Sequence, residues 1–444
     1  MSTLKLWQFT DTHLYARRGK AETHHSVPIL EAGLEAFLAE PDCGILLISG
    51  DLTKNGHADE HLSLIPRLRR VQETGKRVYV ITATHDYGLD FVEECPDDGS
   101  NPLEREGGKM YQSDLRGLYD EFGFRDSIAE FKRNSYVAQL APGVRLLALN
   151  DDGDGRAFCG FYEDQMQWAI EQIEQAKKDG QVLFGMTHHP TIPSSPIYPL
   201  ISLRDMLGNY EETTDRLGDA GLACMFTGHT HMHNIASKTT PNGNTYWDVN
   251  TCSLSDYPGY FREIILDGRH MSVTTKTLPN QHYTPKNMPV YDYLEKDFDS
   301  MLRDLIENAA GDYEKFAHSC GGFSVTYEQA MKLKFPVHMV AKYINRATLG
   351  SLGRLLLVKV PKSVHKQSFK ELFLEFVRNI FAGNEKYGPD TDIHKAAMAF
   401  ARRAEKLAGK KLPPQVRPLP EFLSSLIYDS SPDDAAEIDL QGAQ

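Results

Sequence analysis

Seven acidic and histidine side chains are the residues of this sequence whose types and spacing suggest chemistry. They are Asp11, His13, Asp51, His85, His188, His229 and His231. Carboxylate oxygens combined with several neutral imidazoles suit Zn, Mn, Fe or Co, whereas a magnesium or calcium site would consist mostly of oxygen ligands. The set therefore predicts a transition-metal site.

Two pairs within this set have a spacing that favours a shared target. Asp11 and His13 are two residues apart, as are His229 and His231. In an extended segment, residues two apart point the same way, so we expect each pair to direct both side chains toward one place. A single pair of this kind occurs by chance in many chains. The prediction therefore depends on where all the pieces lie along the sequence.

Each candidate residue follows a short apolar run that is typical of a buried strand, or lies close behind one. The runs are 4–9, 44–49, 77–82, 146–149, 182–186 and 223–226, and most are separated by segments with apolar residues at helical spacing, 29–38, 61–71, 162–176 and 210–217. Buried strands that alternate with helices predict an α/β fold. Ligands in such folds bind beyond the carboxyl ends of the strands, so the polar clusters are expected to form one site.

The character of the sequence changes near residue 280. Apolar residues recur at helical spacing in 290–305, 369–380 and 393–407, without further acidic or histidine clusters. This pattern predicts a mostly helical domain over 281–428 that follows a metal-binding domain over 1–280. The two regions carry net charges of +6 and −14, and the last segment, 429–444, has five acidic residues and no basic ones. We expect that segment to be a disordered acidic tail.

The overall composition argues against several classes of protein. The chain of 444 residues carries a net charge of −13, which repels nucleic acid and anionic lipid, so neither a nucleic acid nor a membrane is expected as a partner. No apolar run approaches the roughly 20 residues of a membrane helix. The first residues do not resemble a secretory signal, and the six cysteines lack C-x-x-C spacing, which is typical of reduced thiols. These features predict a soluble, cytoplasmic protein.

The order of the polar clusters resembles that of the calcineurin-like metallophosphoesterases. Their pattern is D-x-H, G-D, G-N-H-[DE], H and G-H-x-H. Here it reads Asp11-Thr12-His13, Gly50-Asp51, Ala83-Thr84-His85-Asp86, His188 and Gly228-His229-Thr230-His231. The resemblance covers roughly residues 4–275 and implies a four-layer α/β sandwich, to which a C-terminal, mostly helical domain is added. It implies nothing about that helical domain.

Carried over residue by residue, the resemblance implies two divalent or mixed-valence ions of Mn, Fe or Zn. The first ion would be held by Asp11, His13 and His231, the second by His188, His229 and the residue at position 84, and Asp51 would bridge the two. Two such ions acidify a shared water, so that a metal-bound hydroxide attacks the phosphorus. They also offset the charge that builds up in the in-line transition state.

The resemblance also implies roles for residues beside the metals. His85 would stand near the leaving oxygen as a proton donor, and the carboxylate of Asp86 would fix its tautomer and favour the charged ring. Thr84 and His85 are thereby placed against the substrate phosphate. His189, which follows a predicted ligand, is expected either to face the phosphate or to be a packed, hydrogen-bonded ring.

One position departs from the family pattern. The family asparagine, whose side-chain amide binds the second metal, is Thr84 here, and the glycine before it is Ala83. Three alternatives stay open: the threonine hydroxyl or a water replaces the amide oxygen, the second metal arrives with the substrate, or the site is degenerate. Because the other ligands and His85 are present, an active enzyme is favoured over a non-catalytic, metal-binding interaction module.

The residues that follow Asp51 favour a small phosphodiester over a phosphoprotein. Segment 50–56 lacks the Asp-Arg-Gly continuation of the Ser/Thr protein phosphatases, which removes a phosphate-binding arginine. The chain looks more like the small bacterial phosphodiesterases that act on cyclic nucleotides or glycerophosphodiesters. We therefore expect a dinuclear metal phosphodiesterase acting on a small substrate such as a cyclic nucleotide, with a phosphomonoesterase as the alternative. A homo-oligomer formed through the helical domain stays open.

Overall fold

The structure is a computed structural model, and it divides the chain into two compact units. It describes residues 3–16, 24–88, 104, 108, 110–153, 159–201, 206–278, 287–320, 326–409, 412–430 and 433–440. The sheet unit comprises 1–194, 203–294 and 433–444, and the helical unit comprises 195–202 and 295–432. The expected boundary between residues 280 and 281 lies outside the described residues. The units change instead within a helix, after Leu294.

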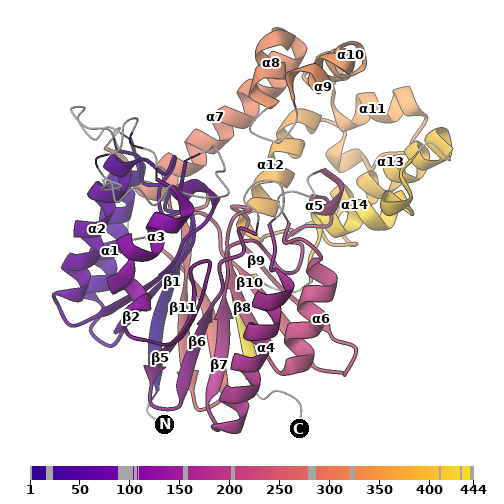
Figure 1. Cartoon of the computed structure of the whole chain (residues 1–444). Helices are drawn as coiled ribbons and strands as arrows, with labels where there is room; N and C mark the ends of the chain where they lie inside the picture. Colours follow the sequence, from indigo (N-terminus) through magenta and orange to yellow (C-terminus); the bar gives the residue numbers. More distant parts are fainter. Residues whose placement is uncertain are drawn as a thin grey trace. The chain divides into compact units, whose positions relative to one another are not determined.

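The first sheet of the sheet unit has six strands in the order β13-β12-β11-β1-β2-β3. Strands β1 (Leu4–Phe9), β2 (Ile45–Ser49) and β3 (Arg77–Ile81) are parallel to one another. Strands β11 (Tyr260–Asp267), β12 (His270–Thr277) and β13 (Ala435–Asp439) extend the sheet beyond β1 in antiparallel pairs. Helices α1 (Ser26–Ala39) and α2 (Ala58–Gln72) lie beside this sheet (Figure 1).

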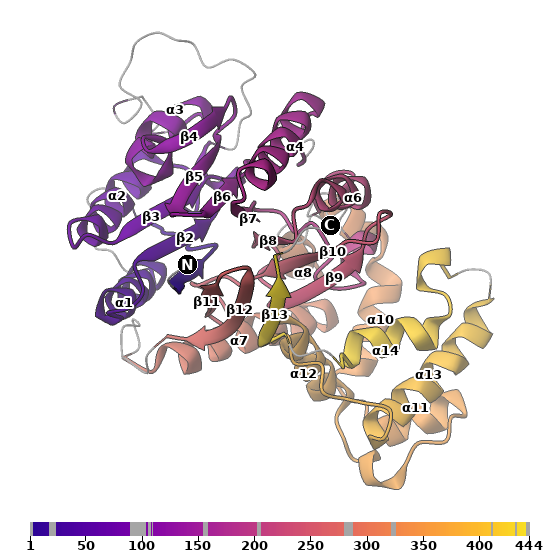
Figure 2. The same cartoon turned by 90° about the horizontal axis from the view of Figure 1, so that it is seen from below.

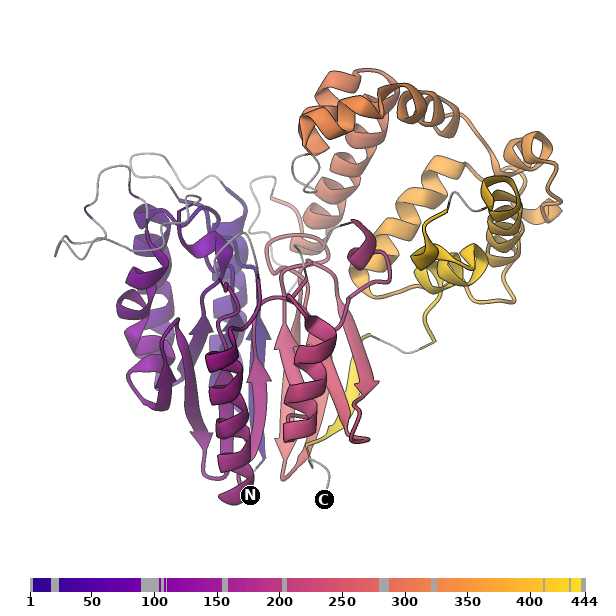
Figure 3. The same cartoon turned by 45° about the vertical axis from the view of Figure 1, so that its right-hand side comes forward.

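The second sheet has seven strands in the order β4-β5-β6-β7-β8-β10-β9. Their bounds are β4 (Ser127–Phe131), β5 (Ser135–Ala141), β6 (Val144–Ala148), β7 (Val182–Met186), β8 (Cys224–Thr227), β9 (Asn234–Thr239) and β10 (Thr245–Asn250). The short α3 (Gln112–Leu118) precedes β4. Helices α4 (Glu163–Lys178) and α6 (Tyr210–Ala220) cover the outer face of this sheet (Figure 3). Apolar side chains of both helices pack there against Leu147, Leu183 and Met225.

The two sheets pack face to face, which gives four layers in the order helix, sheet, sheet, helix (Figure 2). Hydrogen bonds cross between the sheets: the side-chain amide of Gln8 on β1 donates to the Thr227 carbonyl at 3.2 Å, and the Tyr136 hydroxyl on β5 donates to the Val80 carbonyl at 2.8 Å. The expected four-layer α/β sandwich is confirmed. Parallel strands β1, β2 and β3, and β6, β7 and β8, direct their carboxyl ends into the loops that carry the predicted site.

The prediction of a disordered acidic tail is wrong for Ala435–Asp439, which form β13 at the edge of the first sheet (Figure 2). Ile438 is fully buried there, and Glu437 and Asp439 are exposed. The alternation of one inward apolar residue with outward acids is a strand pattern, but the acidic composition hides it. Before the strand, the side chain of Asp433 accepts from the Ile235 backbone at 2.7 Å, and its carbonyl accepts from Arg262 at 2.6 Å.

The helical unit is confirmed as mostly helical (Figure 1). Its helices are α5 (Tyr198–Ile201), most of α7 (Val290–Ala310), α8 (Tyr313–Ser319), α9 (Tyr327–Lys332), α10 (Lys334–Ile344), α11 (Leu349–Leu356), α12 (Phe369–Ala382), α13 (Asp392–Ala408) and α14 (Leu419–Ile427). Hydroxyl side chains cap four of them: those of Thr326, Thr348, Ser368 and Thr391 accept backbone N–H groups of the first helical turns. Within the described residues, no helix is both long and apolar enough to cross a bilayer.

Candidate metal centre

Five of the predicted ligands adopt a left-handed backbone conformation shortly after the end of a strand. Their φ angles are +49° at Asp11, +39° at His13, +48° at Asp51, +69° at His229 and +55° at His231. The expectation that each pair lies in an extended segment is therefore wrong. Sharp left-handed turns after β1 and β8 position these side chains instead. Such a conformation costs an L-residue about 1–3 kcal/mol and is maintained where the surrounding structure enforces it, most often at functional sites.

Two glycines are required at these turns, because other side chains occupy the space that a Cβ atom would take. A Cβ atom on Gly50, whose φ is +98°, would collide with the imidazole of His188. A Cβ atom on Gly228 would collide with the Thr10 hydroxyl and with Oδ2 of Asp11 at 2.5 Å or less. The glycines of the G-D and G-H-x-H sequences are thus required by the close approach of the loops.

The predicted ligand side chains converge in three overlapping groups. Within each group, one possible ligand atom from every residue lies within 4.8 Å of the others: Asp11, His13 and His231; Asp51, His188 and His229; and His13, Asp51 and His85. The Nε2 atoms of His13 and His231 are 3.0 Å apart, and Nε2 of His188 is 3.2 Å from Oδ2 of Asp51. The first two groups contain the acidic and histidine ligands expected for the two metal sites, with Asp51 in the second group and without Thr84.

Asp11 and His188 are each held by hydrogen bonds through one side-chain atom. Their other metal-binding atom, Oδ1 of Asp11 and Nε2 of His188, faces the cluster. Oδ2 of Asp11 accepts from the Thr10 hydroxyl at 2.7 Å and from the His229 backbone at 2.9 Å. Nδ1 of His188 lies 2.8 Å from the Ser49 carbonyl, which can only accept, so Nδ1 carries the hydrogen. The remaining Oδ1 of Asp11 and Nε2 of His188 are buried and make no hydrogen bond within the described part of the chain.

Burial and charge act against each other in this cluster. Burial alone would raise the pKa of Asp11 and Asp51, but the neighbouring histidines, above all His188, outweigh it and hold both carboxyl pKa values below their ordinary range. Burial lowers the pKa of His13 to about 3 against the attraction of Asp51. The two carboxylates and the neutral His13 are thus in the forms that bind a metal ion, whereas Asp51 and Asp11 outweigh burial and raise the pKa of His188 to about 10, so a metal ion would replace its proton.

Asp86 does not pair with the ring of His85, contrary to the expectation from the sequence. The carboxylate of Asp86 is buried, and it accepts from the backbone of Ala83 at 2.9 Å and of Thr53 at 2.8 Å. The reason is the tight turn of η1 (Thr84–Asp86), which points consecutive side chains in different directions. His85 is exposed, and its Nδ1 lies 2.7 Å from the Lys54 carbonyl. That carbonyl is the group that fixes the His85 tautomer.

Thr84 opens η1, directly before His85, and its side chain is half-buried. The His85 backbone N–H donates to Oδ1 of Asp51 at 3.0 Å, which ties this turn to the cluster. The structure thus places Thr84 next to a residue that contacts Asp51. Its role as a ligand or substrate contact stays a prediction.

His189 is buried behind an acid that the sequence analysis did not single out. Its Nδ1 lies 3.0 Å from Oδ1 of Asp151, and its ring centroid lies 4.0 Å from that of His229. Oδ2 of Asp151 accepts from the backbone N–H groups of His188 and His189 and from the Thr187 hydroxyl. This arrangement favours a packed, hydrogen-bonded His189 over one that faces a phosphate. The position of Asp151 just after an apolar run was the available signal.

Asp256 is a second acid beside the cluster that sequence reasoning missed. Its Oδ2 lies 3.4 Å from Nδ1 of His231, on the side of the ring away from Asp11. The imidazole of His231 thus lies between the Asp256 carboxylate and the cluster, which is the arrangement that orients a metal-binding histidine. Asp256 follows no apolar strand, so its contact with His231 becomes visible only in the folded chain.

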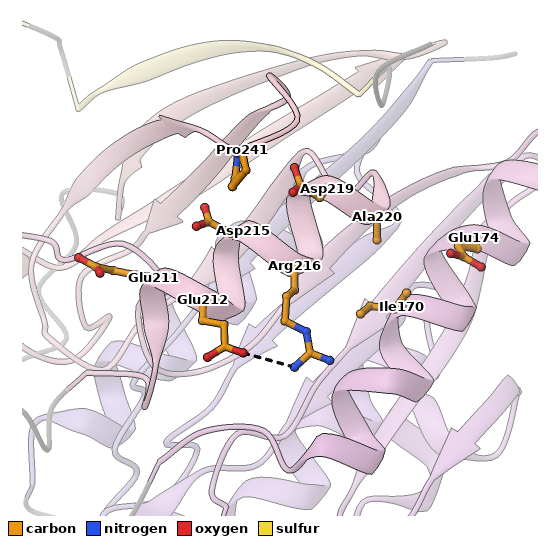
Figure 4. Close-up of a pocket in the computed structure, with 9 residues that line it drawn as sticks. All are labelled: Ile170, Glu174, Glu211, Glu212, Asp215, Arg216, Asp219, Ala220 and Pro241. Carbon is orange, nitrogen blue, oxygen red and sulfur yellow. Dashed lines mark ion pairs between the residues drawn. The ribbon is translucent and has the colours of Figure 1, made fainter.

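A separate hollow lies on the surface between α4 and α6 (Figure 4). It has a volume of about 670 Å³, and several carboxylates line it, including Glu174, Glu211 and Asp219. Arg216 is engaged in ion pairs with Glu163 at 2.7 Å and Glu212 at 3.9 Å. None of the predicted ligands lines this hollow, so it is distinct from the metal-ligand cluster.

One known protein family matches the part of the chain that carries most of the sheet unit. Residues 4–233 match the family described as calcineurin-like phosphoesterase. Among solved structures, a dimetal phosphatase from Danio rerio is similar, with 13% identity, a TM-score of 0.43 and coverage of 62% of this chain and 96% of its own. A phosphopantetheinyl hydrolase from Mycobacterium tuberculosis has 15% identity, a TM-score of 0.32 and coverage of 57% and 90%. No curated protein matched the sequence.

Proposed function

We propose that this chain, which belongs to the calcineurin-like phosphoesterase family, hydrolyses a small phosphodiester such as a cyclic nucleotide. Family membership supports metal-dependent hydrolysis of a phosphoester. The observation that carries the proposal is the convergence of carboxylates and imidazoles from distant loops around donor atoms of Asp11 and His188 that are buried without a hydrogen bond among the described residues. Burying polar atoms without a hydrogen bond is costly, and a cation ligated by them removes that cost.

The residues present fit a pair of transition-metal ions. The proposed ligands are Asp11, His13 and His231 for one ion, His188 and His229 for the other, and Asp51 for both. Carboxylates and imidazoles in these proportions accept Mn, Fe or Zn, and the identity of the metal stays open. When bound, such a pair activates a water and stabilises the charge of an in-line phosphoryl transfer.

The chain's own residues orient the reacting groups. Oδ1 of Asp51 accepts the His85 backbone N–H, so the bridging carboxylate and the exposed imidazole keep a fixed separation. The Lys54 carbonyl holds the hydrogen on Nδ1 of His85, which leaves Nε2 to carry the exchangeable proton. Donation of that proton to the leaving oxygen is the step we assign to His85.

A diester is favoured over a monoester by the charge beside the cluster. A phosphodiester carries one negative charge, whereas a monoester carries nearly two at neutral pH. The segment behind Asp51 offers one exposed cation, Lys54, and lacks the arginine of the protein phosphatases. A phosphomonoesterase would need further positive charge at this position.

The test compares the hydrolysis of bis-p-nitrophenyl phosphate with that of p-nitrophenyl phosphate, after the protein is loaded with Mn²⁺ and its metal content is measured. We expect turnover of the diester to exceed that of the monoester and to fall at least about 100-fold in Asp51→Asn. Asp164→Asn is the matched control, because this carboxylate is exposed on α4 and pairs only with Lys132 among the ion pairs of the described residues. It should leave turnover unchanged.

Three results would change the assignment. Faster turnover of the monoester would indicate a phosphomonoesterase, and a metal-loaded protein inert toward both esters would indicate a binding module. Thr84→Asn should tighten the second metal in a calorimetric titration; an unchanged stoichiometry and affinity would show that position 84 lies outside the ligand set. A screen of cyclic nucleotides then identifies the substrate.

A further inference from the structure

The helical unit contains a long stretch without acidic residues. Between Glu328 and Glu371 the chain has nine Lys and Arg residues and no Asp or Glu, although the whole chain has a net charge of −13. The stretch spans α9, α10 and α11. The net charge of the whole chain argued against an anionic lipid partner. It conceals, however, a strongly basic region.

The same stretch exposes large apolar side chains. Leu333, Phe335, Met339, Val340 and Tyr343 on or beside α10 are 55%, 79%, 53%, 56% and 40% exposed. Further along, Leu355 and Leu357 at the end of α11 are 62% and 83% exposed. Single exposed apolar residues are common on protein surfaces, but a group of this size in one short segment marks an interaction surface.

The outward apolar face of α10 is a continuous stripe. Phe335, Met339 and Tyr343 are spaced by four residues, so they lie above one another on one side of the helix. Other parts of the helix are held within the unit: Ala341 is buried on the opposite side, and Nδ1 of His338 lies 2.9 Å from the Ala309 carbonyl. The apolar stripe is thus a side of α10 that stays exposed although other parts of the helix pack within the unit.

Basic side chains flank this stripe. Lys332, Lys334, Lys342 and Arg346 are exposed. A helix with aromatic and aliphatic residues on one face and lysine or arginine at its margins is the pattern of helices that lie in the interface of a bilayer with anionic lipids. The 11 residues of α10 measure only about 16 Å, about half the thickness of the hydrocarbon layer, so a position in the plane of the interface fits and a spanning one does not.

We propose that the surface formed by α10 and its flanking basic residues binds an anionic lipid bilayer, with Phe335, Met339 and Tyr343 inserted among the acyl chains and the lysines at the headgroups. Charge complementarity selects this occupant. A second copy of the same surface would bring like charges together. A purely electrostatic partner such as a nucleic acid needs the lysines but gives no reason for exposed phenylalanine and methionine side chains.

The test uses the full chain and sedimentation with vesicles of phosphatidylcholine, with and without phosphatidylglycerol. We expect binding to the mixed vesicles to be at least tenfold tighter than to the neutral ones and to weaken with added salt. The double variant Phe335→Ser/Met339→Ser, and separately Lys334→Glu/Lys342→Glu, should each lose at least tenfold in affinity.

Two residues on α13 provide matched controls. Leu407 is 60% exposed and Lys406 is exposed, and both lie outside the acid-free stretch. Leu407→Ser and Lys406→Glu should bind as the wild type does. Circular dichroism shows that each variant is folded, and hydrolysis of bis-p-nitrophenyl phosphate should be the same in all of them, because none of these residues belongs to the proposed centre.

Three outcomes would overturn the proposal. The first is the absence of wild-type binding to the anionic vesicles. The second is a wild-type dimer in light scattering that Phe335→Ser/Met339→Ser dissociates, which would make a second copy the occupant. The third is binding to duplex DNA that Lys334→Glu/Lys342→Glu abolishes while vesicle binding persists unchanged.

Discussion

The two units place polar and apolar side chains in opposite ways. The sheet unit buries many charged and polar groups, among them Asp11, Asp51 and His188, and exposes three of the large hydrophobic side chains that the structure describes as exposed. The helical unit exposes ten such side chains, and its buried polar residues among those described are Ser195, Asn379 and His394. Buried polar groups must be held in a defined hydrogen-bond network, as in the sheet unit, whereas exposed apolar groups, as in the helical unit, mark a surface for binding.

This difference has a practical consequence for measurement. All three tryptophans, Trp7, Trp168 and Trp247, lie in the sheet unit. Tryptophan fluorescence therefore follows the sheet unit alone, while far-ultraviolet circular dichroism also follows the helices of the other unit. This pair of signals distinguishes a response of one unit from a response of both.

The largest effect is expected from Gly50→Ala in the sheet unit. The new Cβ would displace the His188 imidazole, so turnover should fall at least about 100-fold and the free energy of unfolding by about 2–4 kcal/mol. Gly75→Ala is the control, because Gly75 also has a positive φ, +86°, but has open space beside it. It should cost about 1–2 kcal/mol and leave turnover intact. Equal losses of turnover in both variants would show that backbone strain, and not the collision, matters.

The second prediction concerns pH and Asp152. Burial and the neighbouring Asp151 raise its pKa to about 7 in the folded chain. The unfolded carboxyl has a pKa of about 3.9, so between about pH 4 and 7 the folded state holds a proton that the unfolded state releases, and stability falls as the pH rises through this range. The difference between the folded and unfolded pKa corresponds to at most about 4 kcal/mol in the free energy of unfolding. We expect about half of this loss, because the folded chain relaxes around the charged carboxyl.

Urea unfolding followed by tryptophan fluorescence at pH 5 and pH 7.5 measures this dependence. Asp152→Asn, which resembles the protonated carboxyl in shape, should remove the part that Asp152 contributes, whereas Asp86, whose pKa burial and Asp51 raise to about 8, keeps its own part. If the variant and the wild type lose stability in parallel over this range, the proton is bound elsewhere.

A smaller effect is expected from Asp151→Asn. The substitution leaves the size of the side chain but removes the charge that faces His189 and the backbone of His188. Groups that orient metal ligands typically contribute 10–100-fold to affinity, so we expect metal affinity to fall by about that factor. Calorimetric titration with Mn²⁺ measures it, and Asp152→Asn, one residue further on, should change it little. Unchanged affinity in Asp151→Asn would assign Asp151 to packing alone.

The smallest effect is expected in the helical unit. Thr391→Ala removes the hydroxyl that accepts the His394 backbone N–H at the start of α13, which should cost about 1 kcal/mol. The loss should appear in circular dichroism and leave tryptophan fluorescence and turnover unchanged. A parallel shift of both signals would show that the two units unfold as one, and the comparison drawn above would need revision.

The sequence predicted the strands that lead to the centre because they are continuous apolar runs, as in β2, whose five residues are all buried. Strands β9 and β12 were not predicted, because buried residues alternate in them with residues that are partly or fully exposed. The acidic composition similarly concealed β13.

The ligand set was predictable from the order of short motifs, but its local geometry was not. In the sequence, Gly228 is the one signal for the left-handed backbone of His229, and no glycine lies near Asp11. The resemblance assigned Asp86 to the ring of His85, whereas the turn of η1 sends its carboxylate to backbone N–H groups. The contact between Asp151 and His189 exists only after two separate loops have met.

The position of β13 determines when the first sheet can be completed during synthesis. Its partner β12 ends at Thr277, and β13 begins at Ala435, with nearly the whole helical unit encoded between them. At about 5–20 residues per second, a ribosome needs about 8–30 s to cover that interval. Until then the backbone of β12 keeps an open edge in the nascent chain, which is where another strand would attach most readily. The helices must therefore emerge before the sheet that precedes them is closed.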